Sequence, residues 1–237
     1  MKKAIVLSSG GIDSTTCIPV AIKDVGIANV ATVSVSYGQK HSRELDCANK
    51  IAEWYKIPNY IIDFANSGIF DKSDCALLNS SGVKIVHKSY AEQIRDSRGV
   101  VNTYVPFRNG LILSAVASLS LSIYTDCDSV DVYIGVHSDD YAHSAYADCS
   151  VDFINAIAKA IKLGTYGKVN IKAPFVNVNK AEIVRIGLSY MVPYNLTWSC
   201  YEGGSAPCGK CATCIDRLNA FKVNGILEDP WDKSILD

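Results

Sequence analysis

The chain has 237 residues, enough for one sizeable α/β domain with a small appendage, and 49% of them are hydrophobic, which is ample for a core. A formal net charge of −1 gives the protein as a whole no electrostatic reason to bind nucleic acid. The first apolar run is too short for a signal peptide, and the longest, residues 111–124, is broken by serines and too short to cross a bilayer. We therefore expect a soluble cytoplasmic protein without a membrane partner.

Short apolar runs rich in β-branched residues alternate along the chain with segments of helical spacing. The runs predict strands at residues 4–7, 30–35, 60–64, 130–136 and 169–173. The segments predict helices at residues 14–23, 42–55, 108–124, 151–163 and 180–187. This alternation favours a doubly wound, mostly parallel α/β sheet with helices on both faces. Ligands bind such sheets at the carboxyl ends of the strands, so we expect the site there.

Two segments carry more specific expectations. Asn179 is placed to cap the helix at residues 180–187, Glu182 follows three residues later, and Gly187 is predicted to end the helix. Residues 66–102 contain glycines, serines and mixed charges, and predict no regular structure. We expect a surface excursion there, with a mobile flap over the site as the alternative.

The first predicted strand ends in a glycine-rich turn, Ser8-Ser9-Gly10-Gly11-Ile12-Asp13-Ser14, which leads into the first helix. Its glycines let several backbone N–H groups converge on one anion, at which the helix also directs its positive end. The turn lacks the Lys followed by Ser or Thr that a kinase-type P-loop needs, and Asp13 occupies that region instead. A carboxylate beside phosphate favours a bound Mg²⁺. A tight turn without a ligand is the alternative.

Four cysteines lie close together near the end of the sequence, at Cys200, Cys208, Cys211 and Cys214. Four thiolates satisfy tetrahedral Zn²⁺ completely, which predicts a structural rather than a catalytic ion. An iron–sulfur cluster accepts the same four ligands, and a redox disulfide is a third possibility. On this pattern we divide the chain into a nucleotide-binding α/β domain, residues 1–195, and a zinc-binding segment, residues 196–237.

The glycine-rich turn SGGIDS, residues 9–14, resembles the PP-loop of the ATP pyrophosphatase superfamily, which splits ATP into AMP and pyrophosphate. Further motifs follow in order: YGQKH at 37–41, VPFRN at 105–109, NKAEIV at 179–184, and TWSCYEGG at 197–204 leading to CGKCATC at 208–214. Together they resemble the 7-cyano-7-deazaguanine synthase family over nearly the whole chain. The resemblance implies an adenine-nucleotide alpha hydrolase-like fold with a small C-terminal zinc knot.

The resemblance also implies the reaction of an ATP-dependent C–N ligase. The carboxylate of 7-carboxy-7-deazaguanine attacks the α-phosphorus of ATP, and ammonia then displaces AMP to give an amide. A second ATP activates the amide oxygen, and loss of AMP leaves the nitrile, a queuosine precursor. ATP, Mg²⁺, one structural Zn²⁺ per chain and a homodimer are implied with it.

Site residues follow from the matched motifs. The implied ATP-binding residues are Leu7, Ser8, Ser9, Gly10, Gly11, Ile12, Asp13, Ser14 and Thr15. The implied catalytic residues are Asp13, which would hold Mg²⁺, and the cations Arg108 and Lys180 near phosphates or the substrate carboxylate, with Lys40 a weaker candidate. The implied substrate-binding residues are Tyr37, Gln39, Arg108, Asn109, Asp140 and Asp148. We expect His137 and His143 to be surface or loop histidines without a partner.

Several alternatives remain open at this point. Residues 137–150 depart from the family pattern at Ala147 and Ser150, and Phe107 stands where a small residue is commoner. An enzyme that adenylates the same carboxylate but stops at the amide, or transfers the acyl group to another amine, would account for these departures. A PP-loop ligase acting on tRNA is disfavoured by the charge composition. A nucleotide-binding module would bind ATP without releasing AMP.

Overall fold

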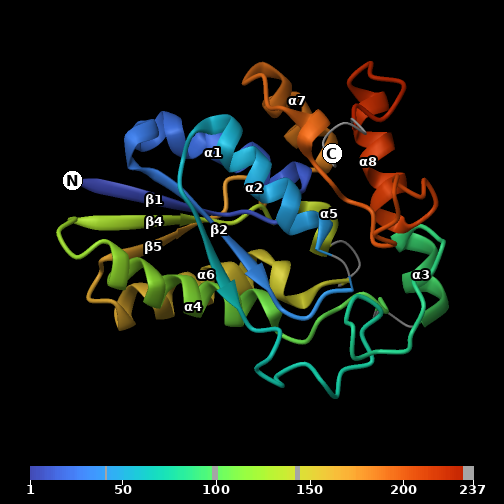
Figure 1. Cartoon of the computed structure of the whole chain (residues 1–237), viewed down its shortest axis with the longest axis horizontal. Coiled ribbons are helices and arrows are strands. Elements are labelled where there is room, and N and C mark those ends of the chain that lie inside the picture. Colours follow the sequence, from blue (N-terminus) through green and yellow to red (C-terminus); the bar gives the residue numbers. More distant parts are fainter. Residues whose placement is uncertain (41, 98–100, 142–144, 232–237) are drawn as a thin grey trace.

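The computed structural model describes residues 1–40, 42–97, 101–141 and 145–231, and a parallel sheet of five strands lies at its centre (Figure 1). The strands are β1 (Lys2–Leu7), β2 (Val30–Ser36), β3 (Asn59–Asp63), β4 (Ser129–Tyr133) and β5 (Val169–Lys172). Their order is β3-β2-β1-β4-β5, and all four neighbouring pairs are parallel. The predicted doubly wound sheet is confirmed, although β4 ends at Tyr133 rather than at residue 136.

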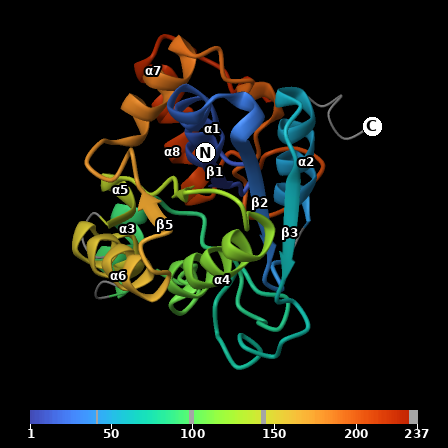
Figure 2. The same cartoon turned by 90° about the vertical axis from the view of Figure 1, so that its left-hand side faces the viewer.

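Helices cover both faces of the sheet, with α1 and α2 on one face and α4 and α6 on the other (Figures 1 and 2). The five predicted helices are present as α1 (Ile12–Val25), α2 (Arg43–Tyr55), α4 (Arg108–Ile123), α6 (Val151–Gly164) and α7 (Lys180–Ser189). The sequence did not predict α3 (Tyr90–Ser97), α5 (Ser138–Tyr141) and α8 (Ala212–Val223). Among the described helices, none combines the length and apolarity needed to span a membrane.

Side-chain alternation along β1 divides the hydrophobic core in two. Ala4 and Val6 belong to a core that includes residues of α1, α2, α7 and α8, whereas Ile5 belongs to a second core with residues of α4 and α6. Ala220 and Phe221 of α8 lie in the first of these cores. The C-terminal segment therefore packs into the same core as the sheet, and the division of the chain at residue 195 stays a prediction.

Helix α7 begins as predicted but ends later. The Asn179 side chain accepts the backbone N–H of Glu182 at 2.9 Å, which confirms the cap. The predicted end at Gly187 is wrong, because α7 continues to Ser189. A Cβ atom at Gly187 would lie 1.8 Å from the hydroxyl oxygen of Tyr194. The glycine is required for close packing and does not terminate the helix.

The described residues between 66 and 102 contain more regular structure than the sequence indicated. It contains α3, and Phe70, Cys75 and Leu78 pack with Tyr37 and Val105 in a third hydrophobic cluster. Leu78 also forms an antiparallel bridge with Gln39, just beyond β2. This segment therefore packs beside the carboxyl end of β2.

Candidate active site

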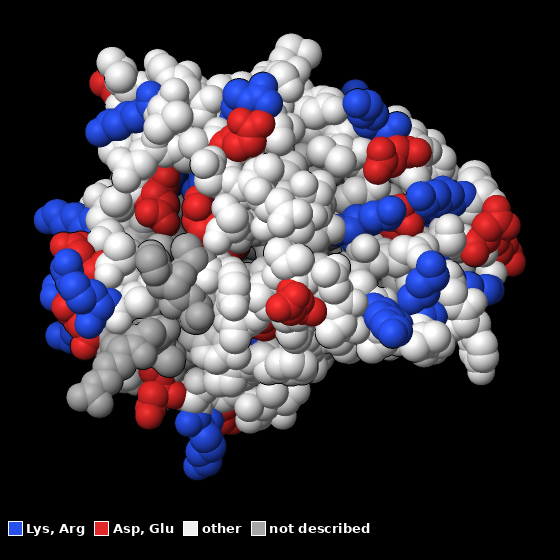
Figure 3. All heavy atoms as spheres, turned by 180° about the vertical axis from the view of Figure 1, so that it is seen from behind, with Lys and Arg blue, Asp and Glu red and all other residues white. Residues whose placement is uncertain are grey.

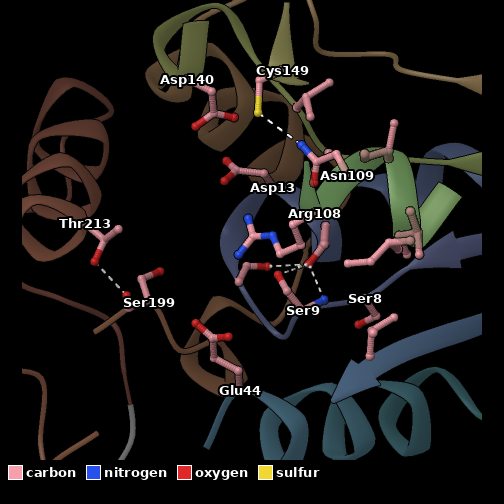
Figure 4. A pocket seen from close by; sticks show the side chains of 18 of the residues that line it. Ser8, Ser9, Asp13, Glu44, Arg108, Asn109, Asp140, Cys149, Ser199 and Thr213 are labelled. Carbon is pink, nitrogen blue, oxygen red and sulfur yellow. Dashed lines mark hydrogen bonds between the residues drawn. The ribbon is translucent and has the colours of Figure 1, made fainter. Parts of the chain in front are cut away.

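A cavity of about 250 Å³ opens at the carboxyl ends of β1, β2 and β4. Its walls come from the glycine-rich loop after β1, from Tyr37 and Gln39 after β2, and from residues 134–136 after β4. Figure 4 shows Ser8, Ser9 and Asp13 at this cavity. The strand order reverses between β1 and β4, and ligands bind open α/β sheets at such a reversal. The fold thus places the cavity where the sequence predicted a site.

Two glycines allow the loop to fold tightly. Gly10 has a φ of +75°, and a Cβ atom there would lie 2.4 Å from the backbone oxygen of Glu44 in α2. A Cβ atom at Gly135 would lie 2.8 Å from the backbone carbon of Asp13, so this glycine lets α1 approach the end of β4. The loop is therefore held between two neighbouring elements at positions where a side chain would clash.

Most of the predicted ATP-binding residues line the cavity. They are Leu7, Ser8, Ser9, Gly11, Asp13 and Ser14. The Ser14 hydroxyl lies 3.2 Å from both the backbone nitrogen and the hydroxyl of Ser9, which closes the loop on itself. Ile12 is buried in the core, and the Thr15 hydroxyl donates to the Gly11 carbonyl at 2.7 Å. Gly10, Ile12 and Thr15 support the loop and do not line the cavity.

Asp13 and Lys180 lie together at one end of the cavity. The Lys180 ammonium is 3.3 Å from one carboxylate oxygen of Asp13. The other oxygen is buried and has no hydrogen-bond partner among the described residues. Mg²⁺ binds through one or two carboxylates together with substrate phosphates, so a buried carboxylate oxygen with no partner beside an anion-binding loop suits this ion.

His137 lies in the loop after β4, as expected, but it is buried behind these groups rather than at the surface. Neither ring nitrogen has a hydrogen-bond partner among the described residues, although two carboxylates lie close by. Its ring nitrogen Nε2 is 3.6 Å from an Asp13 oxygen and 3.4 Å from an Asp140 oxygen, and the side chain is only 3% exposed. Burial raises the pKa of Asp140. Burial acts to lower the pKa of Lys180, but its acidic neighbours, Asp13 foremost, raise it overall. The second candidate, His143, lies outside the described residues, as does His41 at the end of the YGQKH motif.

Arg108 starts helix α4 and extends into the cavity. It donates to the Tyr37 hydroxyl at 3.1 Å, and its guanidinium carbon lies 5.3 Å from the centre of the Tyr37 ring. Phe107, the unusual residue before it, has a φ of +53° and stacks edge-on against Phe153. Lys40 lies elsewhere: it is exposed and donates to the Val83 carbonyl. Of the three predicted cations, Arg108 and Lys180 line the cavity.

Asp148 has a different environment from the other predicted substrate residues. Its carboxylate accepts the backbone N–H of Asn109 at 2.9 Å, so it binds the first turn of α4. Asn109 in turn donates its side-chain amide to the Cys149 sulfur at 3.2 Å. Asn109, Cys149 and Asp140 line the cavity, and Asp148 lies behind that wall. Recognition of the base by Asp148 therefore stays a prediction, whereas its contact with α4 is observed.

Sequence reasoning missed the aromatic wall of the cavity. The hydroxyl oxygens of Tyr90 and Tyr201 are 2.8 Å apart, and that of Tyr146 is 3.3 Å from Tyr90. These residues come from α3, from the C-terminal segment and from the loop after α5. Their spacing along the chain contains no local pattern, so only the tertiary fold brings them together. The same is true of Glu44, whose place in the first turn of α2 suggested only the start of a helix.

The four predicted cysteine ligands meet in one cluster. Their sulfur atoms lie within 4.8 Å of one another, and those of Cys208 and Cys214 are 4.0 Å apart. A tetrahedral ion with bonds of about 2.3 Å to sulfur needs sulfur atoms about 3.8 Å apart. Backbone N–H groups of Cys208 and Cys211 donate to sulfur atoms of the cluster at 3.3 Å. The cluster therefore fits a single bound metal ion.

The cysteine cluster is joined to the cavity through residues 197–201. The backbone N–H of Trp198 donates to the Gly10 carbonyl in the glycine-rich loop at 2.8 Å. The Thr213 hydroxyl donates to the Ser199 carbonyl at 2.7 Å, and both residues line the cavity (Figure 4). The segment that carries the metal ligands thus also forms part of the cavity wall.

Comparison with known proteins identifies the family of this chain. The model of the family described as queuosine biosynthesis protein QueC matches residues 3–225. The chain belongs to this family. The 7-cyano-7-deazaguanine synthase of Caldicellulosiruptor saccharolyticus is 38% identical to it over 98% of this chain and 96% of its own length. That of Archaeoglobus fulgidus is 39% identical over 96% of this chain and 89% of its own length.

Membership of the QueC family helps to decide between the alternative functions that the sequence left open. A third relative, 7-cyano-7-deazaguanine synthase 2 of Colwellia psychrerythraea, is 33% identical over 99% of this chain and all of its own length. These relatives share one name, which disfavours an enzyme that stops at the amide.

On the face in Figure 3, basic and acidic side chains of the described residues are interspersed, with no broad basic patch for a nucleic acid.

Proposed function

We propose that the chain converts 7-carboxy-7-deazaguanine, ammonia and two ATP to 7-cyano-7-deazaguanine, two AMP and two pyrophosphate. The observation that carries this proposal is the cavity itself. It places an anion-binding loop, a carboxylate and two cations beside a wall of tyrosines and hydrogen-bonding side chains. Membership of the QueC family over almost the full length supports the same reaction.

The charged residues would act by positioning and neutralising charge. Backbone N–H groups of the loop and the Lys180 ammonium suit the phosphates, because they lie together at the start of α1. Arg108, at the start of α4, suits the substrate carboxylate, which a guanidinium binds through two parallel hydrogen bonds. This arrangement would hold the carboxylate oxygen against the α-phosphorus, so that most of the rate enhancement comes from proximity.

Asp13 would hold Mg²⁺, which when bound neutralises charge on the phosphates. The four cysteines would hold Zn²⁺, which four thiolates bind with no open position for catalysis. Glycine turns and N–H groups directed at sulfur also suit an iron–sulfur cluster, so metal analysis of the purified protein decides between them. Tyr37, Gln39, Asn109 and Asp140 line the cavity and would contact the deazapurine.

One assay tests the proposed reaction. The purified chain is incubated with 7-carboxy-7-deazaguanine, ATP, Mg²⁺ and ammonium, AMP is quantified, and the product is identified by mass. We expect the nitrile with two AMP for each product molecule. An amide with one AMP, or an adduct with another amine, would overturn the proposal.

The family resemblance also supports two broader proposals. We expect the chain to act in the cytoplasm and to form a homodimer. Sedimentation of the purified protein measures the second directly. A single species of 25.7 kDa at micromolar concentration would contradict it.

A further inference from the structure

The proposed reaction sets a requirement that the charged groups described so far do not meet. Ammonia carries three hydrogens, and the nitrile nitrogen carries none. One proton leaves when the amide forms, and two leave when the adenylated amide becomes a nitrile. The cavity must therefore contain a base that faces this nitrogen and accepts protons at neutral pH.

Three carboxylates line the cavity in the described part of the chain, at Asp13, Glu44 and Asp140. Asp13 is 3.3 Å from the Lys180 ammonium, and Asp13 and Asp140 both lie within 3.6 Å of the His137 ring. Asp13 is thus paired with a cation, and Asp140 lies against the His137 ring. Burial raises the pKa values of the Cys149 thiol and the Tyr90 and Tyr201 hydroxyls, so these groups stay protonated at neutral pH.

Glu44 stands apart from this cluster. It lies in the first turn of α2, and Figure 4 shows its carboxylate pointing into the cavity from that helix, on the opposite side from Asp13 and Asp140. The backbone of Glu44 lies against Gly10, so the base of the side chain is fixed relative to the glycine-rich loop. Among the described residues, none forms an ion pair with the Glu44 carboxylate, and Glu44 lines the cavity.

The electrostatic surroundings of Glu44 suit a base that works near neutral pH. Burial raises the pKa of Glu44 to about 7, and the charge of Arg108, from α4, acts in the opposite direction. The other titratable groups around it are Tyr37, beyond β2, and Cys47, one turn along α2; the pKa values of both are raised, so they remain neutral. A general base is most effective when its pKa lies near the working pH.

We propose that Glu44 is the general base that removes protons from the reacting nitrogen, an inference that rests on the proposed function. In amide formation, ammonia forms the C–N bond, Glu44 takes one N–H proton, and AMP leaves with the electron pair of the C–O bond. In nitrile formation, the amide oxygen displaces pyrophosphate from the second ATP, which leaves an adenylated amide with two N–H protons. Glu44 takes the first of these protons, passes it to water, and then takes the second. The electron pair of the last N–H bond then completes the carbon–nitrogen triple bond, and AMP leaves with the electron pair of the C–O bond.

The test separates proton removal from adenylation. Exchange of labelled pyrophosphate into ATP, driven by the acid without ammonia, reports adenylation, which needs no base at nitrogen. Conversion of the amide to the nitrile reports proton removal, and starting from the amide keeps the ammonia–ammonium equilibrium out of the pH profile. The variants are Glu44→Gln, Glu44→Asp, and Glu53→Gln as a matched control, because Glu53 is an exposed residue of the same helix.

In the wild type we expect nitrile formation from the amide to rise about tenfold per pH unit and to level off above about pH 7. We expect Glu44→Gln to keep the rate of pyrophosphate exchange within threefold of wild type and to lose about 100-fold or more in the rate of nitrile formation. Its rate of nitrile formation should no longer rise with pH. Glu44→Asp should recover part of the rate, and Glu53→Gln should behave as wild type.

Three results would overturn the inference: a flat wild-type profile from pH 6 to 8, near-normal nitrile formation by Glu44→Gln, or equal losses of exchange and nitrile formation. The wild-type profile does not depend on whether any variant folds. A wild type that catalyses exchange but makes no nitrile would overturn the proposed function, and this inference with it.

Discussion

Asp13 shows how one side chain can serve two partners at the site. One of its oxygens lies 3.3 Å from the Lys180 ammonium, and the other is buried without a hydrogen-bond partner among the described residues. A buried acceptor without a partner is costly unless a ligand satisfies it. The geometry thus fits a carboxylate whose second oxygen gains a partner only when nucleotide and cation bind.

We expect Asp13→Asn to reduce AMP formation by about 100-fold or more, because the neutral amide binds a divalent cation poorly and no longer balances Lys180. The metal at the cysteines should stay bound, and Asp126→Asn, an exposed control, should leave activity unchanged. AMP release and metal content measure both expectations. Full turnover by Asp13→Asn would refute the role given to this carboxylate.

Single residues also mark where sequence reasoning about the site ended. The glycine-rich loop and the cysteine cluster are each formed by a short stretch of sequence. The residue types in each stretch indicate its chemistry, so both could be predicted from the sequence. His137 and Glu44 have no such local signal, because the contacts of His137 with Asp13 and of Glu44 with Gly10 join distant segments. Asp148 was placed in the right region, but the tertiary fold directs its carboxylate to the Asn109 backbone.

At the scale of elements, periodicity predicted the sheet and five helices, whereas three helices were missed. Helix α3 lies in a polar segment that contacts Tyr146 and Tyr201. Helix α8 begins within the cysteine motif and contains Cys214, and that motif indicated metal binding rather than a helix. Gly187 was taken for a helix end because glycine is common there. Its role depends on Tyr194, which no local pattern could indicate.

We expect Gly187→Ala to lower the free energy of unfolding by about 1–3 kcal/mol, because the added methyl group would displace the Tyr194 ring and disturb its hydrogen bond to Thr16. Gly164→Ala, at the end of α6, is the control, since nothing lies within 4 Å of a Cβ atom there. It should change stability by less than about 1 kcal/mol. Urea denaturation measures both, and equal effects would contradict the packing argument.

At the scale of the whole molecule, the last part of the chain holds the first part in place. Arg217 of α8 is buried, binds Asp229 through both carboxylate oxygens, and donates to the Thr197 hydroxyl and the Tyr194 carbonyl. Thr197 immediately precedes Trp198, whose N–H binds the glycine-rich loop. Helix α8 and the cysteine cluster thus fix the same short segment from two sides.

We expect Asp229→Asn to cost on the order of 2 kcal/mol of stability, less than for a fully buried pair because the Asp229 side chain is 28% exposed. The variant leaves the Arg217 charge buried without its counterion. Chemical denaturation of this variant, with Glu228→Gln as an exposed neighbouring control, gives the difference. A loss no larger than that of the control would show that the pair contributes little.

We expect Cys211→Ser to give an insoluble or zinc-free protein, because three thiolates and a hydroxyl hold the ion poorly. Any soluble fraction should also need more ATP for half-maximal rate, since Trp198 and Gly10 would lose their fixed contact. Native mass spectrometry and ATP titration measure this, with Cys127→Ser as the control outside the cluster. A soluble variant that keeps the metal and normal activity would contradict a structural role.

The hydrogen bond from Trp198 to Gly10 joins positions almost 190 residues apart in the sequence. Domains begin to fold as the chain leaves the ribosome, starting from the N-terminus. The glycine-rich loop is synthesised well before the segment that braces it. The loop therefore stays without this brace until residues 197–201 have been synthesised and have packed against it.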